Sequence, residues 1–377
     1  MGYPVNNLKT RVKGLHVFLS LLFCVIVSSF FSSSQVFAAA YKSFGPISLV
    51  SQNPIYLQNL QLQARRATAL LPGSSEVQLD YAFSNVFEWE SNNTYDLNVD
   101  MEVHETALSY HRGFQGDIEL GARLPFYTTG GGFLDAFLDS YHNAFSFPRG
   151  GREFVNNGTF NYQLSKNGTN IFSYPEADFD LGDIVLSLKQ QFFHEDQDKI
   201  NAAWFVDFKV PTGTVHSGFS SGRPDFLLGL AADASFKSLR AYLNTALVST
   251  SGLSALQGYM NDQRFAFSFA AECSLLPTWS AIVQLSGGTA LLKGTALTPW
   301  NDVPLDLIIG FRGEEPGLLA GNDLFWQFGF SEDVLSVGPS VDFTTFFSLG
   351  IRFGPEEQKG YQGDWYARSA THSSMGQ

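Results

Sequence analysis

The sequence is poor in cysteine, in charge and in long apolar runs. Its 377 residues include two cysteines, Cys24 and Cys273. Cys24 lies in an N-terminal stretch expected to be removed, so we expect no intrachain disulfide. After residue 40, no stretch approaches the ~20 continuous apolar residues that a membrane-spanning helix needs. Charged residues make up 16% of the chain, and acidic residues outnumber basic ones by 36 to 23. This acidic balance argues against a nucleic-acid partner.

The first forty residues have the features of an export signal. Basic residues come first, an apolar run follows and small residues come last: Lys9, Arg11 and Lys13, then Leu15 to Phe31, then Ala38, Ala39 and Ala40. This order is typical of a cleaved secretory signal. We therefore expect residues 1–40 to be a signal peptide and the mature chain to start near Tyr41. The formal net charge of −13 would fall to near −16, because the signal contains three basic residues and no acidic ones.

Apolar and polar side chains alternate from Ser75 to Glu90. The apolar residues of this tract are Val77, Leu79, Tyr81, Phe83, Phe87 and Trp89. A period of two puts them on one face of a β-strand and the polar residues on the other. A second tract has Tyr95, Leu97, Val99, Met101 and Val103 opposite Asp96, Asn98, Asp100, Glu102 and His104. The turn between the tracts, residues 91–94, favours a β-hairpin.

The same alternation continues almost to the C-terminus. Further tracts include residues 184–188, 204–210, 226–232, 265–273 and 341–353, and Lys166-Asn167-Gly168 indicates a type I′ hairpin turn. Behind an export signal, this pattern predicts an all-β fold, an antiparallel transmembrane β-barrel of about 12–14 strands with one short helical insert. Its apolar face would meet lipid and its polar face would line the interior. A secreted β-sandwich is the alternative, but strands of ten or more residues exceed the usual 5 to 6.

The pattern divides the chain into further segments. Residues 41–74 precede the first clear strand, and they form either a periplasmic extended segment or a plug inside the barrel. Residues 75–353 make up the barrel. The last strand ends at Phe353, and such a terminal aromatic strand resembles the one that outer-membrane barrels present to their assembly machinery. The polar tail, residues 354–377, is expected to be disordered.

One segment, Thr128 to Arg152, departs from the alternation. After three glycines, its apolar residues fall at helical spacing, and Pro148 ends the pattern. The charged residues of this predicted helical insert are Asp135, Asp139, His142, Arg149 and Arg152. The two aspartates and the histidine share one helical stripe, which suits a divalent metal or acid–base chemistry. A solvated helix face at the barrel mouth explains the same stripe without a ligand, so we expect no metal.

The sequence Gly218-Phe219-Ser220-Ser221-Gly222 matches the G-x-S-x-G nucleophile motif. That motif acts only at a sharp turn from a strand to a helix. Here another alternating strand follows, which predicts a flexible Gly/Ser loop.

These observations favour a passive channel or small-molecule conduit of the outer membrane, surrounded by outer-membrane lipid, with no enzyme activity and no cofactor. The candidate lumen residues are Arg123, Lys189, Asp207, Lys209, Arg264 and Glu272. The alternatives are a barrel-embedded lipid-modifying enzyme with His142 as general acid or base, and a structural envelope protein. The sequence leaves the oligomeric state open.

Several short stretches resemble one family. They are Phe44-Gly45-Pro46, Gln52-Asn53-Pro54, Leu97 to Glu102, and Gly130 through His142 to Arg152. Together they resemble the uncharacterised Gram-negative family called domain of unknown function 3187. The phrases Leu181-Gly182-Asp183 and Phe208 to Gly213 are similar to ones common in outer-membrane barrels of the transporter type. These resemblances imply an envelope protein, and they imply no catalytic residues.

Overall fold

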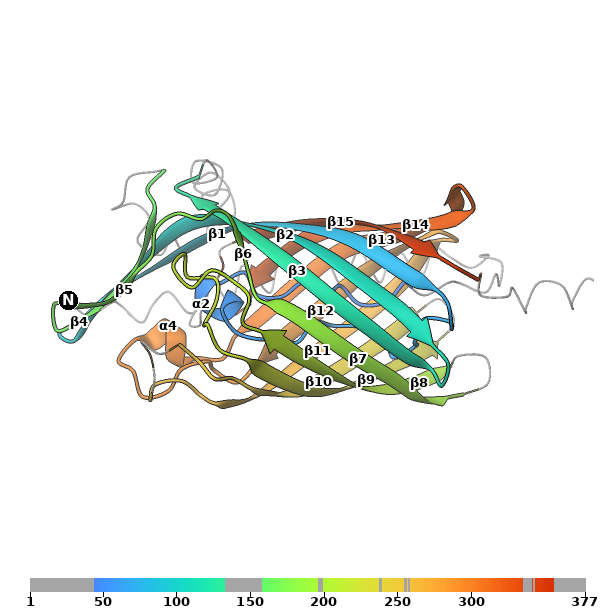
Figure 1. Cartoon of the computed structure of the whole chain (residues 1–377), viewed down its shortest axis with the longest axis horizontal. Helices are drawn as coiled ribbons and strands as arrows, with labels where there is room; N and C mark the ends of the chain where they lie inside the picture. The colour runs from blue at the N-terminus through green and yellow to red at the C-terminus, as the bar shows by residue number, and fades with distance from the viewer. Residues whose placement is uncertain are drawn as a thin grey trace, which may run out of the picture.

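The structure is a computed structural model that describes residues 44–132, 158–195, 199–236, 239–253, 256, 258–334, 341 and 343–355. Within these residues, twelve antiparallel strands close into one barrel (Figure 1). They are β1 (Ser75–Ser91), β2 (Tyr95–Phe114), β3 (Ile118–Gly130), β7 (Ile184–His194), β8 (Ile200–Val210), β9 (Asp225–Phe236), β10 (Leu239–Ser249), β11 (Gln263–Leu276), β12 (Trp279–Gly288), β13 (Leu305–Leu319), β14 (Asn322–Asp333) and β15 (Phe343–Phe353). Closure pairs β1 with β15 from Ser75 opposite Phe353 to Asn85 opposite Phe343. The predicted fold class is confirmed.

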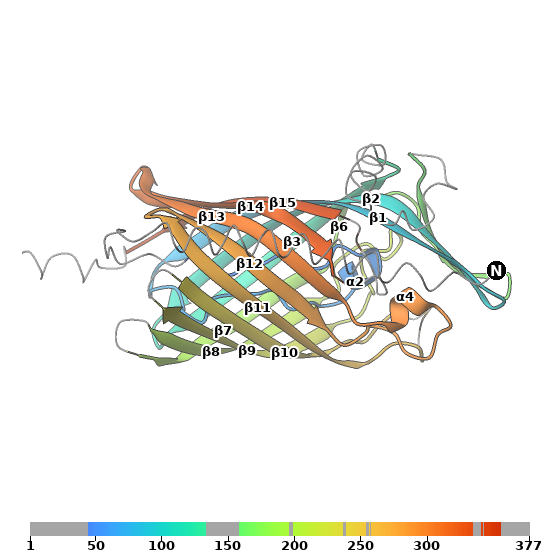
Figure 2. The same cartoon turned by 180° about the vertical axis from the view of Figure 1, so that it is seen from behind.

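The two ends of the barrel differ. At one end, called here the turn end, short connections join β2 to β3, β9 to β10, β11 to β12 and β13 to β14. At the other end, the loop end, longer connections include residues 131–183, 211–224, 250–262 and 289–304. Figures 1 and 2 show the hairpin of β4 (Asn161–Lys166) and β5 (Thr169–Ser173) projecting from the loop end. β4 pairs with the first residues of β2, and β6 (Asp178–Leu181) pairs with the end of β3.

The β4–β5 turn matches the sequence prediction. Asn167 and Gly168 both have positive φ, of 50° and 72°. A type I′ turn needs positive φ at both central residues, which asparagine and glycine tolerate well.

The first residues of the predicted helical insert belong to a strand. Thr128, Thr129 and Gly130 are the last residues of β3 and lie opposite His104, Val103 and Glu102 of β2. The strand extends this far because the two β-branched threonines continue its antiparallel ladder. The remaining candidates of the insert, Asp135, Asp139, His142, Arg149 and Arg152, lie outside the described residues.

The outer surface of the barrel is apolar. Side chains that point outward from successive strands include Leu79 and Tyr81 of β1, Leu228 and Leu230 of β9, and Phe347 and Leu349 of β15, all exposed. Leu230 retains 56% of its accessible surface. Apolar side chains so exposed around a closed sheet match the lipid-facing band of a membrane barrel.

The apolar face of residues 97–103 does not meet lipid, although the alternation suggested that it would. Leu97, Val99, Met101 and Val103 are buried in the interior, where they join an apolar cluster at the loop end. Farther along β2, the same odd-numbered face carries the buried polar residues Glu105 and Ser109. The strand therefore keeps one orientation, and its inward face changes from apolar to polar along its length.

Candidate functional site: the occupied lumen

Residues 44–70 lie inside the barrel and occupy its lumen. They form a hairpin-shaped plug, which we call the luminal segment. Its ascending half, residues 44–53, contacts Glu272 near the turn end of β11 and Glu88 near the loop end of β1. Its apex is the short helix α2 (Pro54–Leu57), which Figure 1 shows within the barrel near the loop end. Its descending half, residues 58–70, returns to the turn end, and residues 71–74 connect it to β1.

Backbone atoms of the ascending half are bound by side chains of the wall. The N–H groups of Phe44 and Gly45 donate to the Glu272 carboxylate, at 3.0 and 3.3 Å. Gln284 both accepts from the Ile47 N–H and donates to the Ile47 carbonyl, each at 2.9 Å. Arg312 donates to the carbonyl of Pro46 at 2.6 Å. Because this extended segment is buried and pairs with no strand, its backbone N–H and C=O groups need side-chain partners for their hydrogen bonds.

The ascending half ends in two polar side-chain contacts. Gln52 donates through Nε2 to Glu105 at 3.0 Å, and Asn53 donates through Nδ2 to Glu88 at 3.0 Å. Asn53 is also the N-cap of α2, since its Oδ1 accepts from the N–H of Ile55 at 3.1 Å. The cap starts the helix where the chain reverses direction.

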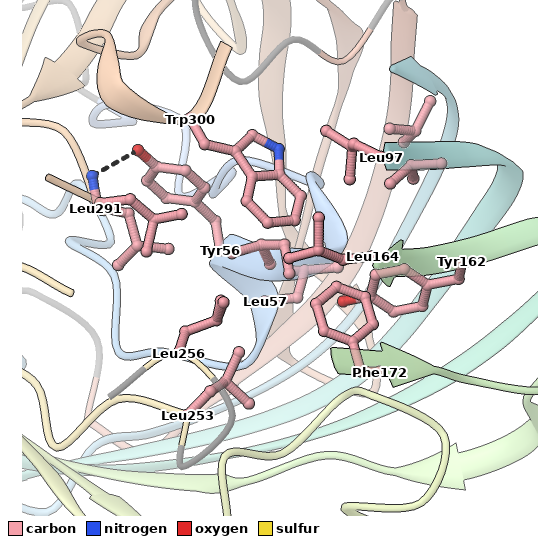
Figure 3. Close-up of a cluster of buried hydrophobic side chains, with 14 of the residues drawn as sticks. Tyr56, Leu57, Leu97, Tyr162, Leu164, Phe172, Leu253, Leu256, Leu291 and Trp300 are labelled. Atoms are coloured by element: carbon pink, nitrogen blue, oxygen red, sulfur yellow. Dashed lines mark hydrogen bonds between the residues drawn. The ribbon is translucent and has the colours of Figure 1, made fainter. Parts of the chain in front are cut away.

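The apex is enclosed by an apolar cluster of loop-end residues. Figure 3 shows Tyr56 and Leu57 surrounded by Leu97, Tyr162, Leu164, Phe172, Leu253, Leu256, Leu291 and Trp300. The indole N–H of Trp300 donates to Glu88 at 2.7 Å, and the Tyr56 hydroxyl accepts from the N–H of Leu291. Burial raises the pKa of Tyr56 to about 12, so its phenol stays neutral. The cluster fixes the apex beneath the loops.

The descending half is bound by charged residues at its loop-end start. Leu60 donates its N–H to Asp225 at 2.9 Å, and its carbonyl accepts from Arg264 at 3.0 Å. Lys209 donates to the carbonyl of Gln58 at 2.6 Å. Lys209 also lies 2.8 Å from a carboxylate oxygen of Asp183 and 3.2 Å from one of Asp225. All three charged side chains are almost completely buried, so they compensate one another.

Farther down, the same half meets β10, β8 and β9. Asn244 accepts from the Arg65 N–H at 3.1 Å and donates to the Arg65 carbonyl at 3.0 Å. The Arg65 guanidinium makes two hydrogen bonds with Asp207 and lies 4.1 Å from the centre of the Phe205 ring. Both oxygens of Asp233 accept from the N–H of Ala67 at 3.0 Å.

The last contacts of the segment lie near the turn end. Lys189 donates to the carbonyl of Thr68 at 2.9 Å and pairs with Glu119, also at 2.9 Å. Glu119 accepts from the N–H of Leu70 at 3.0 Å, and Gln191 accepts from the N–H of Ala69 at 3.1 Å. The segment is therefore bound along its whole length.

All six candidate lumen residues lie among these contacts or next to them. Five contact the luminal segment directly: Lys189, Asp207, Lys209, Arg264 and Glu272. The sixth, Arg123, donates to Glu105 at 3.1 Å, and Glu105 is the acceptor of Gln52. The sequence could not specify that their partner is the chain's own N-terminal segment.

Sequence reasoning did not select several residues that bind the segment, namely Glu88, Glu105, Glu119, Asn244, Gln284 and Arg312. Glu88 is a polar residue of the alternating tract from Ser75 to Glu90, so a signal for it was present. Asp225 and Asp233, which flank the alternating residues 226–232, were likewise not selected. Alternation alone cannot separate a binding side chain from a solvated one.

A small cavity remains between the luminal segment and the wall. It measures about 70 Å³ and is lined by Gln52 and Gln61 of the segment and by Arg264, Ser286 and Asp306 of the wall, among others. Such a volume holds only a few water molecules. In this state the lumen has no room for a larger solute at that position.

Two features with catalytic potential, a metal-binding group and the G-x-S-x-G motif, can be checked in the described residues. No group of three or more His, Cys, Asp or Glu side chains among them is arranged to hold a metal. The G-x-S-x-G motif lies in the loop between β8 and β9, where the Ser220 hydroxyl donates to Asp183 at 2.6 Å. Because a strand follows instead of a helix, the motif is a loop, as predicted. In the described part of the chain, no helix is long and apolar enough to cross a membrane.

The closed sheet, its apolar outer surface and its occupied polar interior define an outer-membrane-type β-barrel. The chain belongs to the family of proteins of unknown function named DUF3187, whose model matches residues 22–354. The resemblance seen in the short motifs is thereby confirmed. Phe44, Pro46, Gln52 and Asn53 of those motifs all make contacts in the ascending half.

Solved structures to which the chain is similar include outer-membrane channels. The COG4313 outer membrane channel from Pseudomonas putida F1 is 14% identical, with a TM-score of 0.53 over 78% of this chain and 100% of that chain. The NanC porin is 8% identical, with a TM-score of 0.38 over 74% and 100%. The channel DcaP of Acinetobacter baumannii is 11% identical, with a TM-score of 0.30 over 76% and 100%. The first likeness shows the fold alone. A comparison with curated proteins gives no match.

Proposed function

We propose that the protein is an outer-membrane conduit that the luminal segment closes, and that solutes pass when this segment leaves the lumen. The observation that carries the proposal is the set of hydrogen bonds between inward-facing side chains and the luminal segment, from Phe44 to Leu70. A barrel of twelve strands is intermediate in width between small barrels that side chains fill and porins that hold an aqueous channel. Removing the segment therefore leaves room in the lumen and exposes the polar side chains that now bind it.

The orientation follows from the two ends of the barrel. Outer-membrane barrels have short turns in the periplasm and longer loops outside the cell. The turn end would then face the periplasm, and the loops that enclose α2 would face the exterior. The segment enters the lumen from the periplasmic side, beside Glu272. It can withdraw to that side once α2 is released from the apolar cluster.

The export signal and the assembly of the barrel belong to the same proposal. Residues 1–40 would be cleaved during export, and the outer-membrane assembly machinery would bind the terminal strand β15, which ends at Phe353. The N-terminal sequence of protein purified from outer membranes tests the cleavage, and a start near Tyr41 is expected. Retention of residues 1–40 in that protein would contradict it.

Conductance in planar lipid bilayers tests the conduit. We expect the full mature chain to hold the bilayer closed, and a variant lacking residues 44–70 to give steady conductance. Heat-modifiable gel migration establishes that both proteins are folded barrels. A folded, inserted variant that leaves the bilayer closed would overturn the proposal and favour a structural role.

A further inference from the structure

The luminal segment is bound mainly through its backbone, and this points to a class of ligand. Resting on the proposed conduit function, we propose that the emptied lumen binds an extended oligopeptide with a basic side chain. The ligand would occupy the wall groups that now hold the descending half, residues 58–70. The luminal segment is then an internal competitor for this peptide site.

One set of wall groups accepts N–H donors along the path. The acceptors are Asp225 for Leu60, Asn244 for Arg65, Asp233 for Ala67, Gln191 for Ala69 and Glu119 for Leu70. They come from β9, β10, β7 and β3, so the row runs from the loop end to the turn end. Three of the five acceptors are carboxylates, which make stronger hydrogen bonds than neutral groups.

A second set of wall groups donates to backbone carbonyls along the same path. The donors are Lys209 for Gln58, Arg264 for Leu60, Asn244 for Arg65 and Lys189 for Thr68. The two sets together pair with both the N–H and the C=O groups of an extended chain, as a neighbouring strand would. Since every residue but proline carries the same N–H and C=O groups, this recognition is independent of sequence.

Two features of the path add selectivity. Two residues of the path, Ala64 and Ala67, are small and almost completely buried, so bulky side chains do not fit at these two positions. At Arg65 the wall instead provides a site for a cation, made by the Asp207 carboxylate and the Phe205 ring. A carboxylate and an aromatic face together favour a guanidinium over a neutral side chain. The favoured ligand therefore has a basic residue at the position of Arg65 and small side chains at the positions of Ala64 and Ala67.

The first test uses the variant lacking residues 44–70, reconstituted in planar bilayers. The probe is a synthetic peptide with the sequence of residues 58–70, added from the turn-end side. We expect it to block the conductance reversibly at a single site. A peptide N-methylated at the positions of Leu60, Ala67 and Leu70 lacks three donors, and we expect it to block at least about tenfold more weakly, given the strength of hydrogen bonds to charged groups.

Two further probes test selectivity. A peptide with Arg65→Ala is expected to block roughly tenfold more weakly, as for the loss of a charge-assisted pair. A neutral oligosaccharide of similar length is expected to block far less than the parent peptide. Equal blocking by the N-methylated peptide, or stronger blocking by the oligosaccharide, would overturn the peptide site. Absence of any conductance before peptide is added would instead contradict the conduit function.

A second variant covers the case in which the deletion does not fold. A protease site inserted between the exposed residues Pro72 and Gly73 allows the segment to be cut after the barrel has folded. Fluorescence anisotropy then follows a labelled peptide of residues 58–70 as it exchanges into the cut barrel. The inference is supported if the labelled peptide binds saturably and the N-methylated peptide fails to displace it. It is contradicted if no saturable binding is seen after the cut luminal segment has been washed out.

Discussion

Arg65 of the luminal segment and Asp207 of β8 form a bidentate ion pair inside the barrel. Nη1 lies 2.9 Å from Oδ1, and Nη2 lies 2.5 Å from Oδ2. Only 1% of the Asp207 side chain is exposed, against 16% of the Arg65 side chain. Removing one partner of such a buried pair is strongly destabilising, because the other charge then remains buried and uncompensated.

Asp207→Asn is expected to weaken closure of the conduit. Loss of one partner of a buried pair costs about 3 to 5 kcal/mol, and the luminal segment can relieve that cost by leaving the lumen. We expect frequent openings in planar bilayers where the unaltered chain stays closed. Asp96→Asn, which changes an exposed carboxylate at the loop end, is the matched control and should leave the protein closed.

The double variant Arg65→Met, Asp207→Leu separates charge from packing. Replacing a buried ion pair by apolar residues of similar volume is often neutral or stabilising, and Phe205 already lies beside Arg65. Closure is expected to return in this double variant. Openings as frequent as in Asp207→Asn would mean that geometry at this position, and not compensation of charge, closes the lumen.

Lys209→Met is expected to destabilise the loop end of the barrel. It leaves Asp183 and Asp225 buried together without their cation, at a cost of about 3 to 5 kcal/mol. The temperature at which the barrel loses its folded gel mobility should fall. Lys293→Met alters an exposed lysine and should leave that temperature unchanged. An equal fall in both variants would argue against a structural role for the Lys209 cluster.

The sequence predicted the barrel well in strands whose alternating apolar residues face outward and whose polar residues face inward. In β9, Phe226, Leu228 and Leu230 face outward while Asp225 and Asp233 face inward, as their alternation required. In β2 the same rule failed, because alternation distinguishes two faces but not which one is inside. Leu97 and Val99 pack against α2, a partner that no local pattern reveals.

The luminal segment was the least predictable part of the site. Its backbone bonds with side chains of distant strands, such as Asn244 with Arg65, and not with a neighbouring strand. Such bonds leave no period in the segment's own sequence, since backbone groups are the same in every residue. The sequence therefore allowed both a periplasmic segment and a plug.

Trp300→Ala is expected to release the apex of the luminal segment. The indole donates to Glu88 and lies in the cluster around Tyr56, and truncating a buried tryptophan costs about 3 to 5 kcal/mol. Trypsin reports the release, because Arg65 and Arg66 become accessible only when the segment moves. Cleavage there should be faster than in the unaltered protein. Trp89→Ala removes a tryptophan that is 46% exposed, and similar cleavage in this control would contradict the prediction.

Leu230→Arg tests whether the outer face of β9 meets lipid. Leu230 points outward near the middle of the strand and lies opposite Trp204 and Thr245. An arginine at the midplane of a membrane barrel costs about 2 to 4 kcal/mol, whereas one near the interface costs about 0 to 1 kcal/mol. Leu318, which is 60% exposed near the turn end of β13, supplies the control Leu318→Arg. Urea unfolding of the two variants in liposomes should show the larger loss for Leu230→Arg. Equal small losses would mean that this face meets water, as the outside of a secreted sandwich would.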